Sequence, residues 1–296
     1  MPDAPELLVV GSIALDTRDG PFGKIKDELG GSALYFALAA SLILPVKLSA
    51  VVGRDAAERV SSAFEGRPVD TTLLEVLDAP TYRWTARQEH GHNVDLGSAD
   101  DIYDSWVPHV PADYAGWAFI GSMRPDRQAQ AVKALHSARL IAADAMLSYI
   151  KEQTAVSKDV LQRTQWYFCN EDEFAALGGG VPENFRRQWW LDGLVLKAGA
   201  GGVTAHTVAG PVHVPALLKH PAFDTTGAGD AVAGGMLARW LSTGAQPSGL
   251  QDALVCGVAC ASLAIESIGI RGIASATPKL LEERVAEVRE WMKHEL

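Results

Sequence analysis

The chain has 296 residues, of which 48% are hydrophobic, and a formal net charge of −10 with a pI near 5.3. This length and apolar content are enough for a sizeable core in one large α/β domain, so we treat residues 1–296 as a single domain. Because the chain is acidic and has no run of Lys or Arg, we expect no nucleic-acid partner, and any phosphate site must be built locally.

Three cysteines are too few for a disulfide framework and indicate a reducing compartment. The first residues have no basic region of the kind found in secretory signals. The longest apolar run, residues 32–46, is short for a membrane span and contains Pro45. We therefore expect a cytoplasmic protein with no membrane partner.

The first predicted element is a buried parallel strand over residues 7–11, where the sequence is a continuous aliphatic run. The segment Gly-Ser-Ile-Ala-Leu-Asp follows and ends at Asp16. Asp16 is thus expected just beyond the carboxyl end of a strand, the edge of an open α/β sheet where ligands bind. We interpret it as a candidate substrate-binding residue.

A glycine pair precedes the next predicted helix. Turn-forming residues occupy positions 17–29, and Gly30 and Gly31 then open a helix of small and apolar residues over 32–40. Without side chains, the two glycines permit close approach of the backbone to a substrate. Both are candidate substrate-binding positions.

Residues 72–98 differ from their surroundings in hydrophobic pattern. Polar and apolar residues alternate here, which predicts half-exposed antiparallel strands. Tyr82 and Trp84 fall on one strand face, where they would stack on a sugar or a base, pack in a small core or form a dimer contact. The segment His90-Gly91-His92 has no third metal ligand nearby in sequence, so we interpret it as a turn.

The remaining elements alternate between strand and helix, as a doubly wound, mostly parallel sheet with helices on both faces requires. Predicted strands cover 46–53, 117–121, 140–143 and 166–169, and predicted helices cover 56–64, 126–136 and 152–162. Arg124 and Asp144 each follow a strand and are candidates for the ligand edge. Arg124 would suit a substrate that already carries a phosphate.

Two further motifs lie between residues 166 and 203. Asn170 and Glu173 follow the strand over 166–169, in an acidic stretch that a helix N-terminus favours for dipole reasons alone. The glycine-rich turn after Lys197, with Gly199 and Gly202, fits neither the P-loop pattern nor the dinucleotide-binding pattern.

The most informative stretch is Asp-Thr-Thr-Gly-Ala-Gly-Asp at residues 224–230, which runs into an apolar helix over 231–241. Free amide groups and the dipole at a helix N-terminus favour an anion, and Gly227 and Gly229 leave room for a phosphate. A carboxylate at Asp230 would repel that anion unless it takes a proton from an attacking hydroxyl. The stretch therefore predicts phosphoryl transfer to an alcohol.

This stretch resembles the C-terminal signature of the ribokinase/PfkB carbohydrate kinase family, Asp-Thr-x-Gly-Ala-Gly-Asp, and meets every fixed position of it. The resemblance implies an anion hole formed by Gly227, Ala228 and Gly229, with Thr225 beside the nucleotide. It also implies that Asp230 is the catalytic base.

The N-terminal motifs are similar to those of the same family. There the equivalent of Asp16 binds substrate hydroxyls and the Gly30-Gly31 pair contacts the sugar. The Asn of the ribokinase pattern is replaced here in the region of Leu34-Tyr35, which leaves the sugar open. The resemblance also implies a ribokinase-like fold with a small β lid, formed here by about 16–30 and 79–100.

The resemblance further implies ATP and Mg²⁺ as cofactors. Asn170 and Glu173 would place Mg²⁺ and phosphates, with Glu173 contacting the metal directly or through water. Lys197, Gly199 and Gly202 would lie beside the nucleotide.

The helices over 231–241 and 250–266 would wall the adenine pocket, closed by the loop 267–272. In some family members the positions of Asp224 and Thr226, with carbonyls of this loop, hold a monovalent cation such as K⁺.

We thus expect an ATP-dependent kinase that phosphorylates a hydroxyl of a small sugar. The alternatives are a nucleoside kinase of the same fold and a non-catalytic nucleotide- or sugar-binding protein. Family members often form homodimers through the lid, and an aromatic lid strand is compatible with that.

Overall fold

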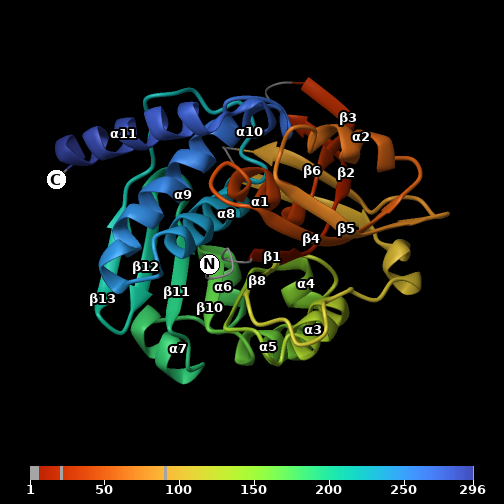
Figure 1. Cartoon of the computed structure of the whole chain (residues 1–296), viewed down its shortest axis with the longest axis horizontal. Coiled ribbons are helices and arrows are strands. Elements are labelled where there is room, and N and C mark those ends of the chain that lie inside the picture. Colours follow the sequence, from red (N-terminus) through yellow and green to blue (C-terminus); the bar gives the residue numbers. More distant parts are fainter. Residues whose placement is uncertain (1–6, 21–22, 90–91, 296) are drawn as a thin grey trace, which may run out of the picture.

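A large sheet forms the centre of the computed structural model, which describes residues 7–20, 23–89 and 92–295 (Figure 1). Its strands are β1 (Leu7–Val10), β4 (Val46–Gly53), β5 (Val69–Leu77), β8 (Trp117–Ile120), β9 (Leu140–Ala143), β10 (Trp166–Asn170), β11 (Gly193–Lys197), β12 (Val203–Thr207) and β13 (Gly210–Val214). They follow the order β13-β12-β11-β10-β9-β8-β1-β4-β5. Neighbours from β5 to β11 are parallel, and β12 and β13 add an antiparallel hairpin at one edge.

Helices cover both faces of this sheet. One layer contains α1 (Ser32–Ala40), α2 (Ala57–Ala63), α8 (Ala228–Ser242), α9 (Leu250–Ile265), α10 (Arg271–Ser275) and α11 (Pro278–Glu295). The other contains α3 (Pro125–Ala134), α4 (Leu147–Glu152), α5 (Thr154–Gln162), α6 (Glu171–Ala176) and α7 (Pro182–Gln188). Leu7 and Val9 join the first core cluster and Leu8 and Val10 the second, because successive strand side chains point to opposite faces. The predicted doubly wound α/β fold is confirmed.

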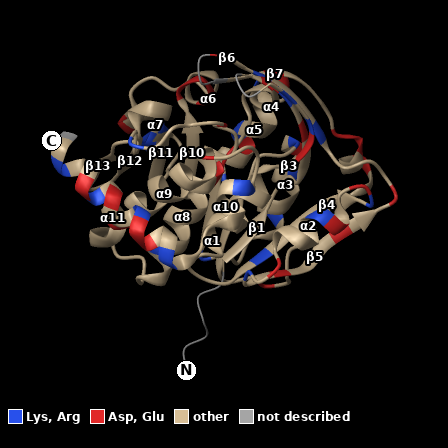
Figure 2. Ribbon diagram, turned by 90° about the horizontal axis from the view of Figure 1, so that it is seen from above, with Lys and Arg blue, Asp and Glu red and all other residues tan. Residues whose placement is uncertain are grey.

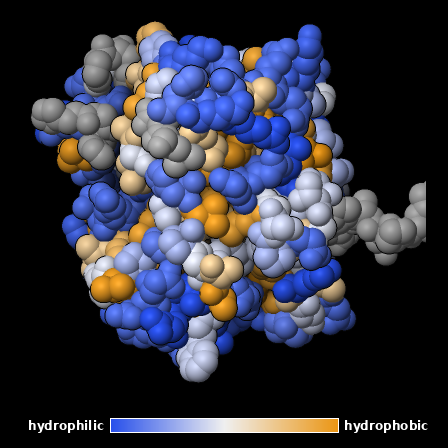
Figure 3. All heavy atoms as spheres, turned by 90° about the vertical axis from the view of Figure 1, so that its left-hand side faces the viewer, coloured by the Kyte–Doolittle hydropathy of each residue, from blue (hydrophilic) through white to orange (hydrophobic). Residues whose placement is uncertain are grey.

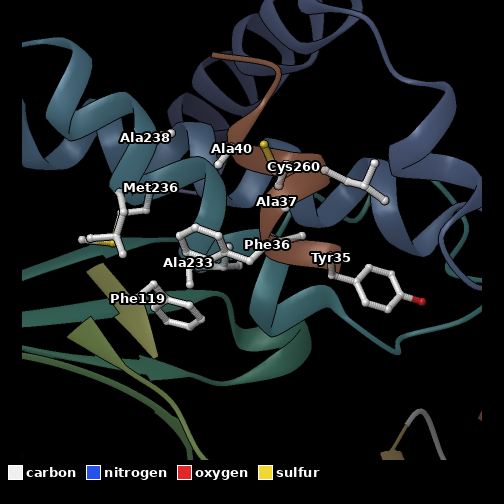
Figure 4. Packing of buried hydrophobic residues seen from close by; sticks show 14 of the residues in the cluster. Tyr35, Phe36, Ala37, Ala40, Phe119, Ala233, Met236, Ala238 and Cys260 are labelled. Carbon is white, nitrogen blue, oxygen red and sulfur yellow. The ribbon is translucent and has the colours of Figure 1, made fainter. Parts of the chain in front are cut away.

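Contacts between α1, α8 and α9 are unusually close because glycines lie at the crossings. A Cβ on Gly234 would stand 2.5 Å from the carbonyl oxygen of Phe36, and one on Gly257 would stand 2.7 Å from that of Val232. Beneath them the ring of Phe36 stacks on Phe119 with centroids 4.3 Å apart (Figure 4). Helix α8 is therefore fixed against both its neighbours and the sheet.

A second sheet of four strands forms the lid (Figure 1, red to orange). Its strands are β2 (Ala14–Gly20), β3 (Gly23–Gly30), β6 (Arg83–Glu89) and β7 (His92–Ala99), in the order β3-β2-β6-β7. Strand β2 begins four residues after β1 ends, which brings the lid to the carboxyl end of the parallel strands.

Two predictions about local structure, both about the strands over 72–98, were wrong. Residues 72–77 belong to β5, a strand parallel to β4 at the edge of the large sheet. None of the residues of this strand is fully buried, because an edge strand is only partly covered. Strand β6 pairs in parallel with β2, so the lid is not purely antiparallel. The helix predicted over 152–162 corresponds to α5 and is preceded by the short α4. The predicted turn at His90-Gly91 lies outside the described residues.

Charged residues of both signs are distributed over the surface, and they alternate along α11 (Figure 2). Hydrophilic residues cover most of the face shown in Figure 3. Within the described ranges, one helical stretch, Pro247–Ile265, is long and apolar enough to cross a membrane, but 67% of it is buried in the fold. It comprises the short η3 (Pro247–Gly249) and α9, and it is a core element.

Candidate active site

The candidate site lies where the first turns of α1 and α8 meet the carboxyl end of β8. Asp230, the third residue of α8, accepts a hydrogen bond on Oδ1 from the hydroxyl of Ser32 at 2.5 Å. The Ser32 oxygen in turn accepts from the amide of Ser122, just beyond β8, at 3.1 Å. The carboxylate is thus held by groups from two other elements.

The glycines of the signature form the N-terminus of α8. Gly227 is the N-cap with φ 75°, and a Cβ there would stand 2.3 Å from the ring of Tyr35. A Cβ on Gly229 would stand 2.9 Å from Nζ of Lys197. With Ala228 between them, these residues form the N-terminus of a 15-residue helix, an end that suits an anion, and the Ala228 amide also donates to the carbonyl oxygen of Thr225 at 3.3 Å.

Lys197 supplies a positive charge next to this turn. Its Nζ donates to Oδ2 of Asp144 at 2.6 Å, and both side chains are largely buried. Lys197, Asp144, Glu173 and Asp230 interact electrostatically with one another. The structure therefore brings together the predicted candidates from the ends of β9, β10 and β11.

Asn170 and Glu173 cap helix α6. The Asn170 side chain accepts from the Glu173 amide at 2.9 Å, and the Glu173 carboxylate accepts from the Asn170 amide at 2.8 Å. This reciprocal capping box fixes Glu173 beside the Lys197 cluster. Part of the Glu173 carboxylate is thus already used by the protein, which fits contact with a metal through water.

Burial and mutual repulsion alter the acidities of these carboxylates. Removal from water and the charge of Asp144 raise the pKa of Asp230 to about 6, although Lys197 and the Ser32 hydroxyl oppose the rise. Burial raises the pKa of Glu173 to about 8, with Lys197 opposing and Asp144 adding to the shift. A pKa near 6 suits a general base that works near neutral pH.

Asp16 lies on the lid side of the site. It is buried in β2, and a Cβ on Gly30 would stand 2.1 Å from its Oδ2, so only glycine fits opposite it. Burial raises the pKa of Asp16 to about 7, opposed by Arg18 and assisted by Asp224 and Asp230. Gly31 has φ 101° and packs against the backbone of Ser12. Hydroxyl groups of a ligand that donate hydrogen bonds to Asp16 would stabilise its ionised form.

Tyr82 and Trp84 differ in exposure. Tyr82 is buried just before β6, shares a hydrogen bond of 3.0 Å with Ser98 and packs against Tyr103. Trp84 is half-buried on β6, and its Nε1 donates to Asp95 at 3.1 Å. Trp84 is thus the more accessible of the two aromatic side chains.

Arg124 caps α3 next to Tyr103, and its charge is already paired. Its guanidinium forms ion pairs of 2.8 Å with both Asp104 and Asp126. A phosphate on the substrate would have to compete with two carboxylates for this side chain.

Two of the predicted nucleotide-binding glycines follow Lys197. Gly199 begins the short η2 (Gly199–Gly201), and a Cβ there would meet open space. Gly202 has φ 86°, and a Cβ there would stand 2.3 Å from the carbonyl oxygen of Val214, so this position packs against the end of β13. The described residues contain no group of three or more His, Cys, Asp or Glu side chains suited to a metal ion.

The contacts between the lid and the signature turn were not predicted from the sequence. Arg18 of β2 forms an ion pair with Asp224 and donates to the Thr226 hydroxyl at 2.7 Å. Gln88 of β6 donates to the Thr225 hydroxyl at 3.4 Å, and Asn93 of β7 donates to that of Thr226 at 3.0 Å. These side chains are separated from the turn by 133 residues or more, so no local motif contains both partners.

Comparison with solved structures shows the same fold in several kinases. A nucleoside kinase from Methanocaldococcus jannaschii is 19% identical, with a TM-score of 0.76 over 96% of this chain and 99% of that one. A Burkholderia thailandensis nucleoside kinase in complex with inosine is 18% identical, with a TM-score of 0.77 over 95% and 98%. A Vibrio cholerae fructokinase with fructose, ADP and calcium bound is 20% identical, with a TM-score of 0.75 over 95% and 99%.

The sequence itself was compared with curated proteins and with family models. No curated protein matches it. The model described as pfkB family carbohydrate kinase matches residues 16–277, a range that includes Asp16, the lid and the whole signature turn. The chain therefore belongs to the pfkB family of carbohydrate kinases.

Proposed function

We propose that the protein transfers the γ-phosphate of ATP to a hydroxyl of a small sugar or sugar-like substrate. The observation that carries this proposal is Asp230, a carboxylate held by the Ser32 hydroxyl at the N-terminus of α8. A base at an anion-binding helix end is suited to activating a hydroxyl toward a phosphate, and family membership supports the same chemistry.

In the proposed reaction, Asp230 accepts the proton of the substrate hydroxyl as its oxygen attacks the γ-phosphorus. A new O–P bond forms while the bond from phosphorus to the bridging oxygen of ADP breaks, and ADP leaves with that electron pair. Amides of the Gly227–Gly229 turn bind the charge that spreads over the transferring oxygens. Asp16 orients the acceptor by hydrogen bonding to its hydroxyls.

On the nucleotide side, Lys197 and the turn with Gly199 and Gly202 approach the phosphates, and Thr225 lies at the start of the signature turn. When bound, Mg²⁺ would neutralise phosphate charge, and Asn170 and Glu173 would hold its water ligands. Capping of α6 keeps both side chains in place for this role.

The test is ADP release from Mg·ATP against a panel of pentoses, hexoses, sugar phosphates and nucleosides. Asp230→Asn should lower turnover by roughly 10²-fold or more, because the base is lost while the shape is kept. Asp252→Asn is a matched control, since Asp252 is likewise the third residue of a helix, α9, but is exposed and paired with Arg289. Turnover that persists in Asp230→Asn would exclude the assigned base.

A nucleoside acceptor is the second candidate. Trp84 favours it, because this half-buried lid side chain offers a stacking surface for a base, and inosine is bound to one of the matched kinases. Phosphorylation of nucleosides but of no free sugar would decide for this acceptor, and Trp84→Leu should then raise the KM for the nucleoside. Nucleotide binding without turnover on any acceptor would indicate a non-catalytic binding protein.

A further inference from the structure

We propose that the guanidinium of Arg18 replaces a monovalent cation beside the signature turn, so that nucleotide binding does not depend on K⁺. This inference deepens the proposed function and rests on it for the identity of the nucleotide. The family resemblance leads one to expect a cation between Asp224, Thr226 and the loop over 267–272. The contacts of these residues disagree with that expectation.

Arg18 reaches the turn from the lid. It lies on β2, its side chain is only 1% exposed, and it forms an ion pair with Oδ1 of Asp224, which is also 1% exposed. The same NH1 donates to the hydroxyl of Thr226 at 2.7 Å. A buried positive charge therefore already contacts both side chains expected at a cation site.

Both oxygens of the Asp224 carboxylate already accept hydrogen bonds. Besides Arg18, its Oδ1 accepts from the Thr226 amide at 3.1 Å. Its Oδ2 accepts from the amide of Gly269, in the loop that would complete the site, at 2.7 Å. A second cation here would be repelled by Arg18 and would have to displace these donors. The residues present do not fit a bound monovalent ion.

The replacement changes how the turn is held. A free ion would bind and leave independently of the lid, whereas Arg18 is part of β2, two residues from Asp16. Arg18 also opposes the rise in the pKa of Asp16. Arg18 is thus a positioning residue. It fixes Asp224 and Thr226, which lie just before Gly227, and it links their position to that of the lid.

The experiment compares wild type, Arg18→Ala and Arg18→Lys in KCl, NaCl and choline chloride at equal ionic strength. The readouts are the thermal unfolding midpoint and the Kd for ADP, neither of which needs turnover. Arg83→Ala is the matched control, because Arg83 is also a lid arginine with two carboxylate partners, but these partners, Asp27 and Asp55, lie outside the signature turn.

Wild type and Arg83→Ala should show a Kd for ADP that changes less than twofold between KCl and choline chloride. In choline chloride, the Kd of Arg18→Ala for ADP should be about tenfold higher than that of wild type. In KCl this Kd should recover at least in part and the unfolding midpoint of the variant should rise, because Asp224 is no longer paired with Arg18 and can bind K⁺. Arg18→Lys should keep a single charge at the site and remain insensitive to K⁺.

The proposal fails if K⁺ lowers the Kd of the wild-type protein for ADP severalfold. This test does not depend on the folding of any variant. It also fails if a folded Arg18→Ala binds ADP as tightly as wild type in choline chloride, or loses affinity that K⁺ does not restore. Binding of ADP that is independent of K⁺, together with no turnover on any acceptor, would support the role of Arg18 and overturn only the proposed kinase activity.

Discussion

The hydroxyl of Ser32 donates to Oδ1 of Asp230 at 2.5 Å, which joins the first residue of α1 to the first turn of α8. This bond favours the ionised form of Asp230 and opposes the rise in its pKa. Ser32→Ala should therefore raise that pKa by about one unit, given the usual strength of hydrogen bonds to charged groups. The acid limb of kcat/KM against pH should move to higher pH by the same amount.

Ser41→Ala is the control for this measurement. Ser41 is also a buried serine of the α1 segment, but its hydroxyl donates to the carbonyl oxygen of Leu38, away from the site. Its pH profile should match that of wild type. A profile of Ser32→Ala that falls at all pH values without a shift would show that Ser32 only positions the carboxylate.

Lys197→Met should weaken nucleotide binding, because it removes the positive charge next to Gly229. We expect the Kd for ADP to rise by about tenfold or more, the usual range for a lost charge-assisted hydrogen bond. Isothermal titration with Mg·ADP measures this, with Lys219→Met as an exposed control. If the unfolding midpoint falls while the Kd for ADP stays the same, Lys197 only pairs with the Asp144 carboxylate and does not bind the nucleotide.

Asp16→Asn should change how stability depends on pH. The folded-state pKa of about 7 exceeds the usual 3.8, so the folded protein holds this proton more tightly than the unfolded chain. The resulting stabilisation is complete below about pH 4 and is lost as the pH rises toward 7, by up to about 1.4 kcal/mol per pH unit. Asn does not titrate, so the variant should gain stability relative to wild type over this range.

Urea unfolding of both proteins at pH 5, 6 and 7 tests this expectation. The free energy of unfolding of Asp16→Asn minus that of wild type should increase at each step. Parallel curves for the two proteins would mean that Asp16 keeps an ordinary acidity. In activity assays the same variant should raise the KM for the acceptor, because the partner for its hydroxyls is weakened.

Gly227→Ala should disturb the signature turn more than a positive φ alone explains. The new Cβ would stand 2.3 Å from the ring of Tyr35. Gly66→Ala is the matched control, because Gly66 has φ 73° against 75° at Gly227 but has no atom within 4 Å of the added Cβ. Gly66→Ala should cost about 1 kcal/mol of stability, and Gly227→Ala at least about 2 kcal/mol. Equal losses in thermal unfolding would contradict the steric argument.

The sequence was most informative where the chemistry is local. The signature turn and the Asn170–Glu173 pair each consist of a few adjacent residues whose roles depend on helix termini, and the structure places both at helix starts. The strands of the parallel core were also predictable, because burial on both faces produces continuous aliphatic runs such as residues 7–10.

Contacts that depend on distant pairing could not be predicted in this way. Arg18 is a single arginine in a polar lid strand, and its hydrogen-bond partner Thr226 lies 208 positions away. Ser32 seemed to be an ordinary first residue of a helix, and its contact with Asp230 spans 198 positions. Strand β5 was misassigned because an edge strand of the large sheet is as partly exposed as a lid strand, so both have a mixed polar and apolar sequence.

The glycine contacts of α8 determine which part of the molecule is free to move during turnover. Gly234 and Gly257 bring backbone against backbone where α8 crosses α1 and α9, so α8 has little room to slide at these two crossings. The lid meets the signature turn through three polar side chains, Arg18, Gln88 and Asn93. For the proposed reaction we therefore expect the lid, and not α8, to move as substrate enters and product leaves, with Asp230 keeping its position.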